Sequence, residues 1–220
     1  MRETPEYVAF WFGPLSNWHK GRPFPGGMAF YDMVGRLDAL GIARPSDAAL
    51  SSRLLRAARF NCGESWMMGV KAWIFDSRPE ALNEDPAVDA VAVYSSIMST
   101  AHPERMSPLA RILRASEPRE HKALGSAKGP IIGFDEAIWA KARVPVVVAG
   151  TIARMDANPK DRAVLLATGD RRLVEGSPHD RIWGVGLKWD DPRIADRSAW
   201  QGLNLLGDAL EQARDALRGR

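Results

Sequence analysis

The chain has 220 residues, of which 45% are hydrophobic, and 30 Lys and Arg against 27 Asp and Glu give a net charge of +3. This length and composition predict one folded domain over residues 1–220 with a substantial core. The basic residues are scattered among acidic ones, which disfavours a dedicated nucleic-acid-binding protein, because such a protein needs a concentrated basic face.

Cysteine and histidine usage disfavours a metal site. Cys62 is the single cysteine, and the four histidines are far apart in the sequence, without the spacing of a zinc site. We therefore expect no metal and no cofactor. The sequence has no apolar run of membrane-spanning length and its N-terminus lacks the features of a signal peptide, so we expect a cytoplasmic protein without membrane contact.

The first predicted element is a strand. Tyr7–Phe12 is rich in aromatic and β-forming residues and stops at Gly13–Pro14. A loop is predicted over Pro23–Gly27, followed by a helix over Ser46–Arg59 with Ser46 as its N-cap. Leucines recur along that helix at the spacing of one apolar face.

The middle of the chain predicts two more helices separated by irregular segments. One helix opens near Asn61 or Gly63 and places positions 64, 68 and 71 on one face. The acidic, proline-containing segment Arg78–Ala92 predicts a loop, and Ala123–Gly133 is also irregular. Asp135 is the expected N-cap of the next helix.

Pro145 is expected to kink or end that helix, because proline lacks the donor amide, and the valines after it fit a helix or a strand. A helix is predicted over Lys160–Thr168 with Gly169 as its C-cap. The final helix is marked by Leu206, Leu210, Ala213 and Leu217 at helical spacing. Because helices outnumber strands, the expected fold is α+β and predominantly helical, with a few short strands.

The run Asp180–Gly186 brings a carboxylate, a guanidinium and an indole into one loop. Gly184 and Gly186 would let the backbone approach a ligand closely, since glycine has no Cβ. This combination suits a ribosylated base and indicates an enzyme site for a nucleotide-like ligand.

Several segments, taken in order, resemble one family, the NADAR superfamily, which contains the YbiA-type N-glycosidases. The matching segments are Leu15–Trp18, Glu64–Trp66 with Lys71–Ala72, Ala123–Gly125, Trp139, Leu165–Asp170, Leu173–Glu175, Asp180–Gly186 and Trp200–Gly207. Each is common alone, but their shared order along the chain is specific.

The resemblance implies cleavage of an N-glycosidic bond, either in a ribosylamino-pyrimidine intermediate of riboflavin synthesis or in ADP-ribose attached to guanine. Two stretches, Pro25–Ala57 and Arg78–His102, resemble insertions relative to compact members. Ser126 stands where an arginine commonly follows the glycine, and Arg154–Met155 replaces a more usual lysine–phenylalanine. The substrate of this chain could therefore differ from that of the better-known members of the family.

Cleavage of the C1′–N bond builds positive charge on the sugar, so a carboxylate is needed nearby. The resemblance makes Glu64 the first candidate, although a glutamate in the first helical turn also suits the helix dipole. Lys71, two turns later, could attack an opened sugar as a Schiff-base nucleophile, or could be a solvated surface lysine. Asp180 could orient the ribose or act as a second acid or base, or could simply form an Asx turn.

Candidate substrate-binding residues complete the predicted site. Trp139 and Trp183 could stack on the base, or could pack in the core. Asn17 and Arg181 could bind ribose and phosphate, or could cap a turn and lie on the surface. Gly184 would give the ligand close access to the backbone.

Two function classes follow. The first is a metal-independent N-glycosidase that acts on a small nucleotide-like substrate or on ADP-ribosylated nucleic acid. The second is a module that binds ADP-ribose without cleaving it, and the joint presence of Glu64, Lys71 and Asp180 favours the enzyme. A structural or nucleic-acid partner role is disfavoured by the dispersed charge. The sequence carries no signal for the oligomeric state.

Overall fold

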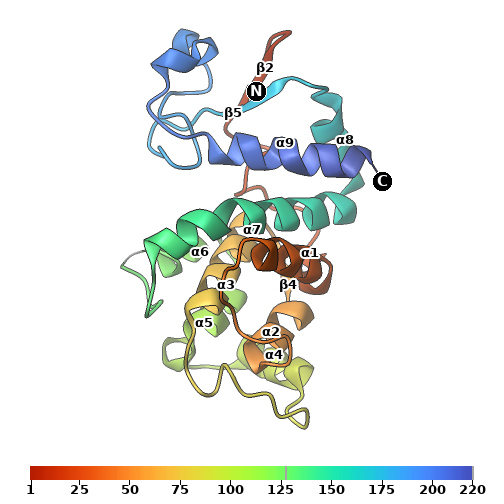
Figure 1. Ribbon diagram of the computed structural model, residues 1–220, viewed down its shortest axis with the longest axis vertical. Helices are drawn as coiled ribbons and strands as arrows, with labels where there is room; N and C mark the ends of the chain where they lie inside the picture. Colours follow the sequence, from red (N-terminus) through yellow and green to blue (C-terminus); the bar gives the residue numbers. More distant parts are fainter. Residues whose placement is uncertain (127, 220) are drawn as a thin grey trace.

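The computed structural model describes residues 1–126 and 128–219 and is mainly helical (Figure 1). The helices are α1 (Gly26–Ala39), α2 (Leu50–Ala57), α3 (Gly63–Phe75), α4 (Ala90–Ser99), α5 (Pro108–Arg114), α6 (Pro118–Leu124), α7 (Glu136–Ala157), α8 (Pro159–Ala167) and α9 (Leu205–Arg218), with 3-10 turns η1 (Pro103–Arg105), η2 (Pro192–Ala195) and η3 (Arg197–Ala199). The strands are β1 (Arg2–Glu3), β2 (Tyr7–Phe10), β3 (Phe24–Pro25), β4 (Arg59–Phe60) and β5 (Arg172–Glu175). The fold is α+β with helix predominating, as the sequence predicts. Of the helices so described, none combines the length and apolar character needed to cross a membrane.

Helix α7 is the centre of the helical layer. It packs against α9 on one side and against α1 and α3 on the other, and it crosses the middle of the molecule in Figure 1. The Asp135 side chain caps it by accepting hydrogen bonds from two backbone amides, as predicted. Pro145 does not end the helix, and the valines after it are helical, because every residue from Val146 to Met155 is buried in the core.

A three-stranded sheet covers the other side of α9. Strand β2 pairs antiparallel with β1 and parallel with β5, so that Tyr7 is aligned with Arg172 and Phe10 with Glu175. Successive strand side chains point to opposite faces. Val8 and Phe10 accordingly enter the main helical core, whereas Tyr7 and Ala9 join a smaller cluster beneath the loop that follows β5.

The predicted loop at Pro23–Gly27 is wrong. Strand β3 lies there and pairs with β4, and α1 begins at Gly26. Phe24 is fully buried and packs on Phe60, so the segment is part of the core. A Cβ at Gly26 would collide with the Leu55 carbonyl oxygen, so this glycine serves a close helix contact and does not indicate a loop.

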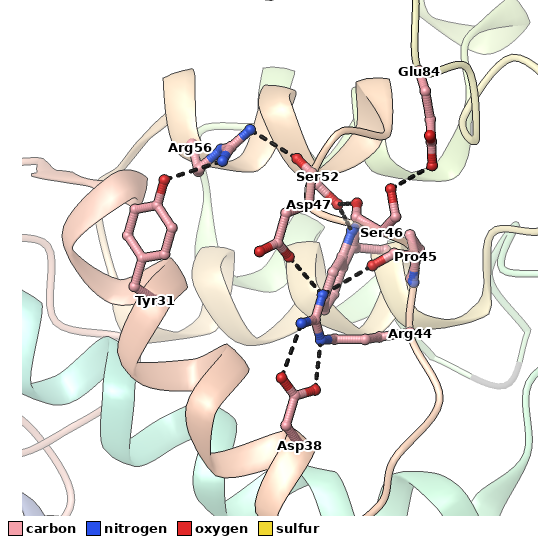
Figure 2. A network of polar contacts seen from close by, with 10 residues as sticks. Tyr31, Asp38, Arg44, Pro45, Ser46, Asp47, Ser52, Arg56 and Glu84 are labelled. Carbon is pink, nitrogen blue, oxygen red and sulfur yellow. Dashed lines mark hydrogen bonds and ion pairs between the residues drawn. The ribbon is translucent and has the colours of Figure 1, made fainter.

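The predicted start of α2 at Ser46 is also wrong, because the helix begins at Leu50 with Ala49 as its N-cap. The preceding residues are held by a polar network instead (Figure 2). Arg44 donates two hydrogen bonds to Asp38 at the end of α1 and one to Asp47. Ser46 donates to Glu84, which ties this loop to the segment before α4. Figure 2 thus shows a hydrogen bond between the two stretches that resemble insertions, Pro25–Ala57 and Arg78–His102.

Smaller differences occur at element ends. The first strand ends at Phe10 and not at Phe12, and the irregular segment from Arg78 gives way to α4 at Ala90. Helix α8 ends at Ala167, and Gly169 follows with a φ of 60°, the left-handed conformation in which a glycine ends a helix. Helices α3 and α9 begin and end within a few residues of their predicted positions.

Candidate active site

A cavity of about 270 Å³ lies where α3, α6, the start of α7 and the loop after β5 meet. This is close to the size of the smaller ligand pockets in proteins, on the order of 300 Å³. Its walls collect charged and aromatic side chains from segments far apart in the sequence. The lining residues are Asn17, Trp18, Glu64, Met67, Met68, Lys71, Lys122, Gly125, Ser126, Glu136, Trp139, Arg143, Glu175, Asp180, Ile182, Trp183 and Leu206.

Helix α3 supplies two of the predicted residues from one face. Cys62 and Ser65 form a reciprocal cap at its start, which fixes the first turn. The backbone amide of Glu64 donates to the Asn17 carbonyl at 2.9 Å, so the loop before α1 and the helix are held together at the cavity. Glu64 and Lys71 are both buried, and both side chains line the cavity.

Glu64 is poised between its two protonation states. Burial raises its pKa from 4.5 to about 7, and the negative charge of Asp180 acts in the same direction. The positive charges of Lys122 and Lys71 and the hydrogen bond from the Trp18 side chain oppose this rise. A carboxyl group with a pKa near neutrality can exchange a proton with substrate or water at physiological pH.

Glu175 is a site residue that the sequence did not single out. It is the last residue of β5, and its side chain points to the same face as Leu173, toward the helical layer and the cavity. Asn204 fixes the backbone there, accepting from the Glu175 amide at 3.0 Å and donating to the Leu173 carbonyl at 2.9 Å. The alternation along Leu173–Val174–Glu175 is the signal that could have identified it.

The environment of Glu175 favours its protonated form. Burial, together with the nearby negative charges of Asp180 and Glu64, raises its pKa to about 8, against the opposing influence of Lys122. One carboxyl oxygen, Oε2, is buried without a hydrogen-bond partner. At neutral pH this group can therefore act as a proton donor.

Asp180 forms an Asx turn and also reaches the cavity. Its Oδ1 accepts from the backbone amides of Ile182 and Trp183 at 3.1 and 2.8 Å. Its Oδ2 lies 3.3 Å from the Lys122 Nζ, which itself lies 5.8 Å from the centre of the Trp18 ring. The two interpretations of Asp180 are thus compatible, because one oxygen shapes the loop and the other pairs with Lys122, which also lines the cavity.

Lys71 is held in a partly apolar environment. Its Nζ donates to the Gly125 carbonyl at 2.8 Å and lies 4.0 Å from the centre of the Phe134 ring and 5.5 Å from that of Trp139. Burial lowers the pKa of Lys71, while the charges of Glu136 and Glu64 act to raise it. A lowered pKa makes the neutral, nucleophilic amine more accessible.

Six of the eight predicted site residues line this cavity: Asn17, Glu64, Lys71, Trp139, Asp180 and Trp183. Arg181 and Gly184 do not line it. The Arg181 guanidinium donates to the Gln201 side chain at 3.2 Å, and Gly184 packs closely against the backbone of Glu175 and Gly202. Gly184 therefore brings two protein segments together and does not face the cavity.

The cavity also contains charged residues that were not predicted, namely Lys122, Glu136 and Arg143, and it contains Ser126. Ser126 donates to the Ala123 carbonyl at 2.8 Å and carries no charge. Within residues 1–126 and 128–219, no three His, Cys, Asp or Glu side chains are grouped so that they could hold a metal ion.

The sequence model of the NADAR domain family matches residues 12–218 of the chain. The chain belongs to the NADAR family. The match extends over all the elements that line the cavity, from the loop at Asn17 to α9.

Three curated relatives illustrate the similarity of this NADAR chain. Protein irg-1 of Caenorhabditis elegans is 34% identical over 49% of the chain and 50% of its own length. An N-glycosidase of Acanthamoeba polyphaga mimivirus is 33% identical over 48% of the chain and 60% of its own length. A chloroplastic riboflavin biosynthesis protein of Zea mays, PYRR, is 26% identical over 61% of the chain and 20% of its own length. The chain thus spans less than two thirds of the length of these relatives.

Proposed function

We propose that this NADAR chain is an N-glycosidase that hydrolyses the bond between a ribose and a nucleobase-like group. The observation that carries the proposal is the convergence of Glu64, Glu175 and Asp180 on one cavity, beside a buried lysine and three tryptophans. A reader of ADP-ribose needs contacts but no group with a pKa near neutrality. The relative named as an N-glycosidase supports the same reaction class.

The chemistry requires a cation-stabilising group, an acid and a nucleophile. As the C1′–N bond breaks, the base leaves with the electron pair, and Glu175 donates the proton that neutralises it. The Glu64 carboxylate stabilises the positive sugar and then accepts a proton from the water that attacks C1′. Asp180 orients the ribose hydroxyls, and Trp139 and Trp183 stack on the base.

Lys71 offers a second route to the same products. After the sugar ring opens, the neutral amine of Lys71 attacks C1′, and the C1′–N bond then breaks, so that the base leaves with the bonding electron pair and a proton from Glu175. Water hydrolyses the Schiff base that remains, which releases the sugar and restores the amine. Burial beside Phe134 and Trp139 favours the neutral amine. The two routes differ in whether the enzyme becomes covalently attached to the sugar.

Two substrate classes fit the proposal: ADP-ribose linked to guanine, and a phosphorylated ribosylamino-pyrimidine of riboflavin synthesis. The relative named as a riboflavin biosynthesis protein favours testing the second class. Mass spectrometry of the products after incubation with each class decides between them. Tight ADP-ribose binding with both substrates left intact would support the non-catalytic module instead.

The catalytic assignment is tested with Glu64→Gln, Lys71→Ala and an exposed control, Lys141→Gln. We expect Glu64→Gln to reduce turnover by about 100-fold or more, the scale of a general acid or base, while the control retains it. Borohydride should trap a sugar adduct that Lys71→Ala loses if the lysine route operates. Folded Glu64→Gln and Lys71→Ala proteins with full turnover would show that the assignment is wrong.

A further inference from the structure

Arg143 is a cavity residue whose guanidinium is only partly satisfied. It lies on the second turn of α7, and its side chain is 11% exposed. One terminal nitrogen, Nη1, donates to Glu136 at 3.2 Å, while the Nε atom is buried and has no hydrogen-bond partner. A buried N–H group is costly to leave without a partner, so an acceptor that reaches the Arg143 Nε would bind there favourably.

The partner that Arg143 does have is easily released. The Glu136 side chain is 63% exposed and lies in the first turn of the same helix. An ion pair with an exposed partner contributes little, because water solvates the freed carboxylate almost as well. A doubly charged anion entering the cavity would therefore compete favourably with Glu136.

The two lysines that line the cavity are engaged through their ammonium groups. Lys122 pairs with Asp180, and Lys71 donates to the Gly125 carbonyl. Among the described cations that line the cavity, Arg143 is the one with a buried N–H group that has no hydrogen-bond partner. The planar guanidinium presents a fork of N–H groups that matches two oxygens of one phosphate.

We propose that Arg143 binds a phosphate group of the substrate and that Glu136 holds the guanidinium until the phosphate displaces it. This inference rests on the proposed function for the identity of the ligand, a phosphorylated ribose. The phosphate can come from a ribose 5-phosphate monoester or from the diphosphate of ADP-ribose. In either case Glu136 and the phosphate are alternative partners of one guanidinium, so Glu136 limits the affinity for the ligand.

Isothermal titration calorimetry with ribose 5-phosphate, ADP-ribose and unphosphorylated ribose tests this inference. The variants are Arg143→Gln, Arg143→Lys and Glu136→Gln, with Lys141→Gln as a control because it is exposed on the same helix. We expect Arg143→Gln to weaken binding of at least one phosphorylated ligand by about tenfold or more and Glu136→Gln to strengthen it about threefold or more. Arg143→Lys keeps the charge but loses the fork, so it should bind with intermediate affinity.

Each result decides the inference. An effect confined to ribose 5-phosphate identifies a monoester site, and one confined to ADP-ribose identifies a diphosphate site. The inference is overturned if the wild-type chain binds neither phosphorylated ligand, if Arg143→Gln binds them as the wild type does, or if Glu136→Gln weakens binding. If Arg143→Gln does not fold, the sign of the Glu136→Gln effect decides alone.

Failure of the inference differs from failure of the proposed function. Phosphate binding that depends on Arg143 and Glu136, without cleavage of either substrate, would refute the proposed glycosidase function and support the phosphate site. Normal turnover and unchanged affinity for the phosphorylated ligands in Arg143→Gln would refute the phosphate site and support the glycosidase function.

Discussion

Substitution of Glu64 by glutamine should reduce turnover by about 100-fold or more and at the same time make the folded protein more resistant to alkaline conditions. The pKa of Glu64 is raised from 4.5 to about 7, mainly by burial, so the folded protein binds this proton more tightly than the unfolded chain does. The stability that the protonated group contributes is complete below pH 4.5 and is lost as the pH rises through about 7. The neutral amide of Glu64→Gln is unaffected by this titration.

The expected magnitude follows from the two pKa values. At about 1.4 kcal/mol for each pKa unit, full ionisation of Glu64 costs the folded protein about 3 kcal/mol. Between pH 5.5 and pH 8.5 the loss is about 2 kcal/mol, since part of it has occurred by pH 5.5. The free energy of unfolding of Glu64→Gln should therefore exceed that of the wild type by a margin that widens by about 2 kcal/mol over this range.

Urea unfolding of both proteins at several pH values measures this margin. Glu6→Gln is the matched control, because Glu6 is exposed and its substitution should leave the margin flat. Removing the Glu64 charge also lowers the pKa of Glu175, which that charge helps to raise. A margin that stays constant between pH 5.5 and 8.5 would refute the description of Glu64 as a buried carboxyl group with a raised pKa.

Three further predictions concern the pH profile and the packing. The ratio kcat/KM should rise as Glu64 ionises near pH 7 and fall as Glu175 ionises near pH 8. The result is a narrow bell-shaped profile whose two apparent pKa values describe the coupled pair of carboxyl groups. A profile that is flat from pH 5 to 9 would contradict the roles of Glu64 as base and Glu175 as acid. Lys122→Gln should move the acid limb to higher pH, because the Lys122 charge lowers the pKa of Glu64, and a shift in the other direction would exclude this influence. Gly207→Ala should destabilise the protein by about 1–3 kcal/mol, because the added Cβ would meet the backbone of β5. Gly35→Ala has open space around the added Cβ and should stabilise the protein by about 0.5–1 kcal/mol. Equal shifts of the two thermal unfolding curves would contradict the close packing of α9 on β5.

The sequence was most informative where burial and local preference agree. The apolar face of α9 predicts that helix, and the sequence predicts the start of α3 close to its N-cap at Cys62. Helix α1 was missed because the glycines at its start read as a loop signal, and no capping side chain marks its beginning. The reason for Gly26 is the approach of α2, a tertiary contact with no local pattern.

The same distinction applies to the candidate site. Glu64, Lys71 and Asp180 lie in segments that the family resemblance singles out, and all three line the cavity. Lys122 and Arg143 carry no local signal, because a single basic residue on a short or mixed helix is usually a surface residue. Their place in the cavity results from how α6 and α7 pack beside α3, which a linear pattern does not report.

The parallel pairing of β2 with β5 has a consequence for the protein during its synthesis. A ribosome releases Glu64 and Lys71 long before β5 exists, so the early helices emerge with half of the cavity wall missing. Parallel pairing between distant segments also forms slowly. A nascent chain should therefore carry exposed acidic and basic side chains, and the cavity is complete only once Glu175 and Leu206 have docked.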